Sequence, residues 1–505
     1  MVGTAQRWVA RGAERRYLVA ALLFLAVVLA RLPFATTHLW AWDSVFYARA
    51  LEVGFHVDAD PNAARPHPPG YIWYVLAAQL LRAAVGDSNA AYVLLSIVAS
   101  AAGAALLWLV ASRWMRPQVA LVLALAYAAS PLVWTYSEIA YPYTLLALVS
   151  LVVGWLVVDG HHPVVSSLAF GLLSGARQDI LLLLGPLWVW SIAGLGARRI
   201  AAAAAAAAFG IAAWWIPSAA LSGGAQAYVA ALLRQTDDVV TSYSVPANGM
   251  PALLYNLSFT AEAIGWALGL LLIPLALGVA RAAVSAWRRR VILPGRLAVG
   301  LSLWVIPGTV VFTFVHIGEW GHVLSVVPPL FLAAGVLVDR ARPRPRSRAW
   351  AVAAAAVVIL PASAFLSGDA AYAAVAGPAD FSAAALARHD AGMRERIRYV
   401  RRHFNAAGTV VLAREDYQLV RYYLPEYRAW YWDPDPHAKR PAKKKRAMRP
   451  VTVVVFTEGL QPRIPAETHR IEVSPGVTLA TFPLEQGNVL ELQGERYAVL
   501  EAPGR

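Results

Sequence analysis

Long, uninterrupted apolar runs dominate the first 366 residues of the chain. Runs of about 18–20 apolar residues are long enough to cross the hydrocarbon core of a bilayer as helices. The runs are continuous and do not alternate with polar residues, which favours helices over the strands of a barrel. The predicted spans are 17–34, 90–111, 117–134, 141–158, 163–176, 180–196, 200–221, 262–280, 296–315, 322–338 and 350–366.

One further apolar run, 71–86, is short and is interrupted by Arg82. Loops rich in Lys and Arg remain on the cytoplasmic side of a membrane. With the N-terminus in the cytoplasm, the basic loops fall inside only if 71–86 does not cross. We therefore expect this run to lie in the outer interface or to re-enter, which leaves about eleven spans. The basic loops are 113–116, 198–199, 281–290 and 340–348.

After residue 366 the pattern changes to that of a soluble domain. Residues 381–404 have apolar positions at helical spacing among many charges, and 415–424 also reads as a helix. Runs rich in Val, Ile and aromatic residues predict strands at 408–413, 427–432, 451–456 and 471–482. The predicted fold class is thus an α-helical polytopic membrane protein with a small C-terminal α/β domain.

The predicted domains are 1–366 in the membrane and 367–505 outside the cytoplasm. Within the first, 35–89 forms the first extracytoplasmic loop with interfacial helices. The position of the soluble domain makes acceptor recognition the first hypothesis for its role.

Composition agrees with a membrane protein. The chain has 505 residues, of which 59% are hydrophobic and only 15% are charged, whereas soluble domains are about 25% charged. The net charge of +14 comes mostly from Arg in the short loops that set orientation, so we expect no nucleic-acid partner. The absence of Cys excludes disulfides, thiolate metal sites and a Cys nucleophile.

Asp43 follows the first predicted span directly and is flanked by aromatic residues. A carboxylate beside a bilayer is costly unless it is used or paired. Asp43 could act as a general base toward a hydroxyl or as an oxygen ligand of a divalent cation. It could also simply cap a helix that runs through Leu51.

Four short motifs lie in or beside the segments that are predicted to be outside the cytoplasm. They are Asp43-x-x-x-Tyr47, Pro68–Tyr71, the aromatic and acidic stretch Tyr136–Tyr143, and the Pro-rich stretch His322–Pro329. Together with the layout they resemble the membrane-embedded GT-C glycosyltransferases, and in particular the bacterial protein-mannosyltransferase and aminoarabinose-transferase group. The resemblance covers roughly residues 15–340.

The resemblance implies an inverting glycosyltransferase of the cell envelope, which transfers a hexosyl or pentosyl group. Such enzymes take the sugar from a polyprenyl-phosphate donor, in the bilayer, and pass it to a protein, lipid or glycan on the outer face. It implies a multi-pass protein of the inner (plasma) membrane, with Asp43 as the general base. Many relatives carry a second acid after this Asp, where this chain has Ser44. A divalent cation therefore stays an open hypothesis, and the metal ligands are unknown.

A lipid-phosphate donor needs a cation for its phosphate, and a guanidinium fits phosphate because its donors form a planar fork. An ion pair with Asp179 or interfacial snorkelling would equally explain Arg177. The outward candidates for this role are Arg49, Arg65, Arg177 and His322.

Aromatic side chains and a carboxylate could bind the sugar. Glu138 lies among aromatic residues that include Tyr141, although an interfacial aromatic belt with a capping Glu gives the same pattern. Tyr47, Tyr71 and His67 are further substrate-binding candidates. His316, Glu319 and His322 lie within seven residues and are either a metal site or a solvated loop.

Two other functions compete with a glycosyltransferase. A ligase or polymerase of lipid-linked glycans would place its key residues in a large late outer loop, whereas the late outer loops here are short. A non-enzymatic transporter or flippase would show ionisable residues in mid-span and paired broken helices. The sequence shows no mid-span acid, and its intraspan prolines form no matching pairs.

Overall fold

A computed structural model of the chain separates into two compact units. The first comprises Met1–Thr36 and Tyr47–Leu386, and the second comprises Thr37–Phe46 and Ala387–Arg505. The second unit thus includes a segment from near the N-terminus. The predicted domain division at residue 366 stays a prediction. The structure describes residues 2–60, 63–287, 295–341, 347–368, 370–377, 379–432, 445–448, 451–457, 469–484, 489–492 and 495–499.

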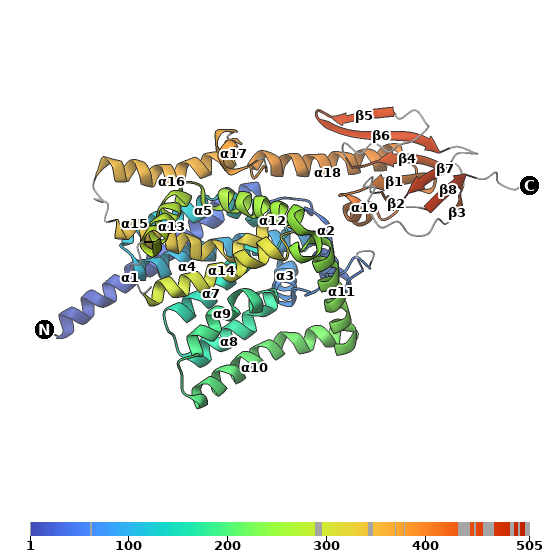
Figure 1. Ribbon diagram of the computed structural model, residues 1–505. Helices are drawn as coiled ribbons and strands as arrows, with labels where there is room; N and C mark the ends of the chain where they lie inside the picture. Colours follow the sequence, from blue (N-terminus) through green and yellow to red (C-terminus); the bar gives the residue numbers. More distant parts are fainter. Residues whose placement is uncertain are drawn as a thin grey trace, which may run out of the picture. The chain divides into compact units, whose positions relative to one another are not determined.

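All the regular elements that the structure describes in the first unit are helices, as the long apolar runs predict (Figure 1). Its helices are α1 (Val2–Arg31), α2 (Trp42–Val53, which begins in the second unit), α3 (Ile72–Val85), α4 (Ser88–Trp114), α5 (Pro117–Ala129), α6 (Pro131–Ser137), α7 (Tyr143–Val158), α8 (Pro163–Leu173), α9 (Ile180–Ile192), α10 (Ala197–Leu221), α11 (Ala225–Tyr243), α12 (Val245–Leu268), α13 (Leu272–Trp287), α14 (Arg296–Phe314), α15 (Val327–Arg340), α16 (Arg348–Ser367) and α17 (Ala370–Ala376). Short 3₁₀ turns include η3 (Ser174–Ala176) and η5 (Trp320–Ser325).

Among the described residues, six helices are long and apolar enough to cross a membrane, or seven if the bent pair α5 and α6 is one span. The chain is therefore a multi-pass membrane protein, while the count of eleven spans stays a prediction. Helix α3 has 14 residues, or about 21 Å of helix, which is shorter than the roughly 30 Å hydrocarbon core. The basic segments 288–290 and 342–346, used to predict orientation, lie outside the described residues.

Helix ends follow the local sequence. Ser130 and Pro131 separate α5 from α6, with a bend of 56°, because Pro has no N–H and is favoured at the first position of a new helix. The Ser130 hydroxyl accepts from the Val133 N–H and caps α6. Asp87 caps α4 in the same way, through the Ala90 N–H at 2.8 Å. These breaks set where the chain leaves the bundle and where polar side chains can gather.

The second unit contains most of α18 (Ala383–His403), together with α19 (Tyr417–Tyr423) and two sheets. The five-stranded sheet has the order β2-β1-β4-β6-β5, with β1 parallel to β2 and β4, and with antiparallel β4–β6 and β6–β5 pairs. The three-stranded sheet has the order β3-β8-β7. The strands are β1 (Thr409–Ala413), β2 (Arg428–Tyr431), β3 (Lys445–Met448), β4 (Val451–Val455), β5 (His469–Ser474), β6 (Val477–Leu484), β7 (Val489–Leu492) and β8 (Glu495–Val499).

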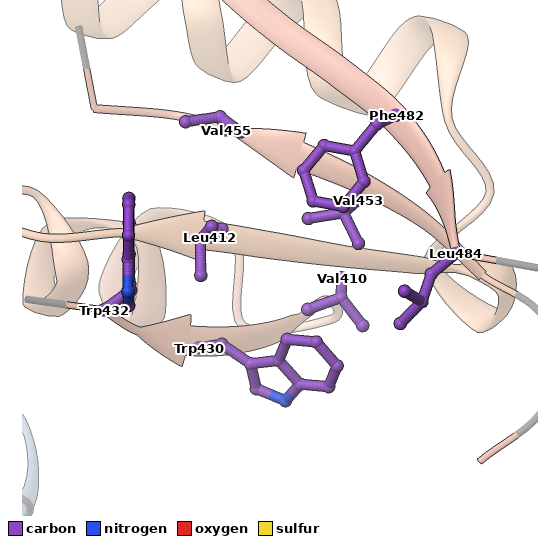
Figure 2. Packing of buried hydrophobic residues seen from close by; sticks show 8 residues of the cluster. All are labelled: Val410, Leu412, Trp430, Trp432, Val453, Val455, Phe482 and Leu484. Atoms are coloured by element: carbon purple, nitrogen blue, oxygen red, sulfur yellow. The ribbon is translucent and has the colours of Figure 1, made fainter. Parts of the chain in front are cut away.

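One face of the larger sheet carries an apolar core (Figure 2). Its members come in pairs two residues apart, as a strand requires for side chains that share a face. The segment predicted as strand at 471–482 is in fact a hairpin, since Gly476 turns the chain between β5 and β6 with φ of 75°. The small α/β domain is thus confirmed. The paired core residues are Val410 and Leu412, Trp430 and Trp432, Val453 and Val455, and Phe482 and Leu484.

Candidate active site

Asp43 lies in the first turn of α2. A carboxylate there is favoured by the helix dipole, so a contribution to the start of the helix is one role of this residue. Tyr47 follows one turn later, and residues four apart share a face of a helix. Arg49 is half-buried in the same helix. The loop 35–89 thus presents Asp43 and Tyr47 from one short helix, as the first of the four motifs requires.

Tyr47 belongs to a buried group of tyrosines in the first unit. Its ring centroid lies 5.1 Å from that of Tyr71 and 5.3 Å from that of Tyr74, both edge to face. The Tyr92 hydroxyl donates to the backbone carbonyl of Tyr47 at 2.9 Å. Edge-to-face rings with a paired hydroxyl hold α2 against α3 and α4 in one arrangement.

The Pro68–Tyr71 motif forms the corner that leads into α3. Gly70 has φ of 93°, and Tyr71, which precedes the helix, has φ of 56°. A non-Gly residue in this region is strained by about 1–3 kcal/mol and persists where neighbours hold it. The Tyr228 hydroxyl does so by donating to the Pro69 carbonyl at 3.0 Å. His67 precedes this corner, and its ring centroid lies 5.4 Å from that of Tyr71.

Arg177 is the cation of this region. It follows η3 and pairs with Asp179, with Nε 3.0 Å from Oδ2, and its side chain is only 15% exposed. The guanidinium carbon lies 6.0 Å from the Tyr71 ring centroid and 5.8 Å from that of Tyr143. Burial opposes its charge, but the Asp179 carboxylate and the surrounding tyrosines outweigh burial and raise the pKa of Arg177. The guanidinium therefore stays charged.

Half-buried His316 and buried His322 face the same region, with ring centroids 5.8 Å apart. The His322 ring also lies 5.4 Å from the Tyr143 ring. Its Nδ1 accepts from the Gly318 N–H at 3.3 Å, which leaves the proton of the neutral ring on Nε2. Burial, and then the Arg177 charge, lower the pKa of both: His322 well below its ordinary value and His316 to about 4.

His67 acts electrostatically on both of these histidines. The loop before α3, the loop before α9 and the segment after α14 therefore bring together one fixed cation and three imidazoles. The His322 Nε2–H and the Arg177 guanidinium are hydrogen-bond donors, whereas His67 Nδ1 already donates to the Pro68 carbonyl at 2.7 Å. The guanidinium and the His322 ring can therefore bind an anion such as a phosphate. We refer to Arg177, His67, His316 and His322 as the cationic cluster.

Glu138 lies in a different environment from the cationic cluster. It is 0% exposed, and neither of its carboxylate oxygens has a hydrogen-bond partner in the part of the chain that the structure describes. Burial raises the pKa of Glu138 to about 8, against the opposing charge of Arg31. Arg31 itself lies over the Trp134 ring at 4.4 Å. Tyr141, three residues on, instead stacks on Tyr143 at 5.3 Å and so reaches the edge of the cluster.

His316, Glu319 and His322, which the sequence leaves as either a metal site or a solvated loop, are not arranged together as a metal site. The Tyr136 hydroxyl donates to the Glu319 carboxylate, while His316 and His322 face Arg177. Within the described ranges no group of three or more His, Asp or Glu side chains is arranged to hold a metal ion. A divalent cation stays a prediction that these residues do not support.

Sequence reasoning missed Tyr228 and gave Tyr143 no role of its own. Tyr228 is fully buried on α11 and bridges Gln178 to the Pro69 carbonyl. Its contact with Pro69 spans 159 residues, and no local pattern signals such a pairing. Tyr143 stood in the aromatic stretch at 136–143, but only packing shows that its ring lies between Arg177 and His322.

The combination of a helical unit with an added α/β domain is a fold that the chain shares with solved structures. The chain is similar in structure to ArnT, an aminoarabinose transferase, from Cupriavidus metallidurans. The form bound to undecaprenyl phosphate matches with a TM-score of 0.57 and 15% identity over 92% of this chain and 97% of that chain. The apo form has a TM-score of 0.54 and 15% identity over 95% and 98%.

A structure of the Archaeoglobus fulgidus oligosaccharyltransferase has a TM-score of 0.48 and 13% identity over 85% of this chain and 63% of that chain. Neither a family model nor a curated protein matches the sequence. At these identities the likeness to ArnT establishes the fold alone, and the chemistry has to be inferred from the residues of the site.

The lowered pKa of His316 predicts a pH dependence of stability. Between pH 6.5 and about 4 the unfolded state binds a proton that folded His316 does not, so the stability present above pH 6.5 is lost as the pH falls through this window. We expect the apparent Tm of the detergent-solubilised protein to fall from pH 6.5 to 4.5, and His316→Gln to reduce that slope. The same substitution at exposed His162 is the control, and equal slopes in all three proteins would contradict the prediction.

The Gly70 corner predicts a second stability effect. A Cβ on Gly70 would lie 2.3 Å from Val57 Cγ2, whereas a Cβ on Gly54, which has nearly the same φ (91° against 93°), meets nothing within 4 Å. Gly70→Ala should therefore destabilise by about 1–3 kcal/mol more than Gly54→Ala, because both variants share the cost of positive φ. The Tm values of the two variants test this prediction. An equal fall in Tm would show that the corner adjusts to the added methyl group.

Proposed function

We propose that the protein is an integral-membrane glycosyltransferase that moves a sugar from a polyprenyl-phosphate donor to an envelope acceptor, with Asp43 as general base. The cationic cluster carries this proposal. A buried, permanently charged Arg177 beside neutral imidazoles suits the phosphate of a lipid donor, because charge-assisted hydrogen bonds to phosphate are strong in a site of low dielectric. The fold shared with an ArnT bound to undecaprenyl phosphate supports it.

The proposed reaction is a single displacement. An acceptor hydroxyl oxygen attacks the anomeric carbon of the sugar, and its proton passes to the Asp43 carboxylate. The bond between the anomeric carbon and the phosphate oxygen breaks, and the phosphate leaves with the electron pair. One displacement inverts the anomeric centre. Arg177 stabilises the negative charge that develops on the departing phosphate, as preorganised donors do at the point where charge appears.

The tyrosines of the site fit the sugar. Tyr47, Tyr71 and Tyr141 are buried next to the cationic cluster, and we propose that they, together with His67, shape the site in which the sugar is held. Glu138 is less suited to contact a sugar because it is fully buried beside Arg31. We therefore propose that Glu138 and Arg31 support the segment before α7, and that Tyr141 and Tyr143 present the surface that the substrate meets.

The proposed location is the inner membrane, with the N-terminus in the cytoplasm and the α/β domain outside. The cationic cluster does not support the competing hypothesis of a transporter. Its residues lie in the turns between helices, at 67, 177, 316 and 322, whereas a transport site lies on broken helices at the midplane. A glycan ligase or polymerase uses the same kind of donor and differs in the acceptor.

Mass spectrometry of envelope glycolipids and glycoproteins tests the proposal. Cells without the protein are compared with cells that carry the wild-type gene at matched membrane levels. We expect one sugar modification to disappear with the gene and to return with it, and the modified molecule then names the acceptor. An unchanged set of glycans, with altered distribution of a lipid-linked precursor across the membrane, would favour a flippase instead.

A further inference from the structure

The segment just before Asp43 is held by the C-terminal α/β domain. Residues Thr37–Phe46 group with the second unit by their contacts, although the helix they open, α2, ends in the first unit. Sequence predicts only a loop between the first span and a helix here. The structure instead shows a peptide held between Thr37 and Trp42 by side chains from α18 and α19 and by the Glu415 carbonyl just before α19.

Asp390 on α18 makes the main attachment. Its Oδ2 accepts from the Thr37 N–H at 2.7 Å and from the Thr37 hydroxyl at 3.0 Å, while Oδ1 accepts from the His38 N–H at 3.0 Å. The His38 ring lies 3.5 Å from the same carboxylate. Burial raises the pKa of Asp390, but these donors outweigh burial and lower it overall. Both carboxylate oxygens are thus committed to two consecutive residues of the segment.

The attachment continues to the residue next to Asp43. The Leu39 N–H donates to the Tyr423 hydroxyl at 2.8 Å, and the Leu39 carbonyl lies 3.0 Å from His389 Nε2. The Trp40 ring lies on the His389 ring, with centroids 4.4 Å apart. The Trp42 indole then donates to the Glu415 carbonyl at 2.7 Å. We refer to these contacts, together with those of Asp390, as the clasp.

We propose that the clasp makes the C-terminal domain part of the catalytic apparatus, with Asp390 as a positioning residue that sets where Asp43 stands. The inference rests on the proposed function, in which Asp43 is the base. A general base acts only within hydrogen-bond reach of the proton it removes, and a displacement of about 1 Å can cost roughly 100-fold in rate. Since Trp42 is clasped and Asp43 follows it, loosening the clasp moves the carboxylate.

The clasp also has a consequence for the domain's role. Acceptor recognition was the first hypothesis for this domain, from its position alone. If the domain fixes the position of Asp43, an acceptor that binds the domain can shift the base through α18. Transfer then depends on the domain even for an acceptor that never contacts the domain.

Asp390→Asn, with Glu426→Gln as control, tests the inference in the full-length protein. The Asn side chain has an NH₂ group in place of one carboxylate oxygen. This group cannot accept a hydrogen bond, and it would face the N–H of Thr37 or His38. Glu426 pairs with Arg401 in the same domain, its side chain makes none of the clasp contacts named above, and it loses its charge in the same way. Three readouts are taken: hydrogen exchange of residues 37–46, affinity for undecaprenyl phosphate, and the rate at which the glycan restored by wild type accumulates.

We expect Asp390→Asn to speed exchange in 37–46, to leave undecaprenyl phosphate affinity within about two-fold, and to slow transfer by roughly 10- to 100-fold. Glu426→Gln should match wild type in all three. If Asp390→Asn does not fold, Tyr423→Phe, which removes only the hydroxyl that accepts from Leu39, should give a smaller effect of the same pattern.

Faster exchange with an unchanged transfer rate would overturn the inference, and so would unchanged exchange in 37–46. Asp43→Asn measured in parallel separates the two proposals. An inactive Asp43→Asn beside a fully active Asp390→Asn rejects the clasp and keeps the base. A fully active Asp43→Asn rejects the base itself, and the positioning role falls with it.

Discussion

Replacing Asp43 by Asn is expected to reduce glycosyl transfer by about 100- to 10,000-fold, the range that a positioned general base contributes. Asn has nearly the same shape as Asp, so the helix and its packing are retained. The amide nitrogen, however, cannot accept the proton of the acceptor hydroxyl. Affinity for undecaprenyl phosphate should stay close to that of wild type, because the proposed phosphate ligands centre on Arg177.

The alternative role of Asp43, at the start of α2, has its own matched control. Asp87 caps α4 through the Ala90 N–H, and Asn caps a helix about as well as Asp. Asp87→Asn should therefore leave transfer and Tm nearly unchanged. If Asp43→Asn restores the glycan at the wild-type rate, as Asp87→Asn should, then Asp43 only stabilises its helix, where a first-turn carboxylate is worth about 0.3–1 kcal/mol.

Arg177→Gln is expected to weaken undecaprenyl phosphate binding by roughly 30-fold or more. Removing one partner of a buried charge pair costs about 2–5 kcal/mol, and about 1.4 kcal/mol corresponds to a factor of ten. Arg177→Lys should recover only part of the affinity, because an ammonium lacks the planar fork of the guanidinium. The measurement is a binding isotherm on the solubilised protein.

Two controls separate lost binding from lost stability. Arg177→Gln leaves Asp179 without its ion-pair partner, and Arg177→Gln/Asp179→Asn removes both charges; the double variant should regain Tm without regaining affinity. Arg116→Gln breaks another Arg–Asp pair of the first unit, in which Arg116 Nε lies 2.6 Å from Asp339 Oδ1. It should lower Tm but keep affinity. Full affinity in Arg177→Gln would show that Arg177 only neutralises Asp179.

The local features of the fold could be read from the chain. Continuous apolar runs predict α4, α10 and α14, because a helix in lipid must be apolar over its length. Helical spacing of apolar positions predicts α18 in the soluble domain, and a Val-rich run predicts β1. The predictions were less accurate where a turn residue interrupts a run, as at Gly476, which divides one predicted strand into two.

The candidate site could be listed from sequence but not assembled. His67, Arg177 and His322 were named for their chemistry, and packing brings them together with His316, for which the sequence left a metal site and a solvated loop open. Glu138 was named on the same grounds and packs with Arg31 instead. Most pairs among these residues are more than 100 positions apart along the chain. Contacts over such separations depend on which helices pack together.

Sequence alone determined the class of this protein: a multi-pass helical membrane chain with a small C-terminal α/β domain. Hydrophobic length and periodicity suffice for that, since each reports on neighbours within a few turns. Only the tertiary structure decided that Arg177 stands among three imidazoles and that Asp390, 353 residues from Thr37, holds the segment before Asp43. Those contacts arise because helices that pack side by side bring distant loops together, which no local pattern encodes.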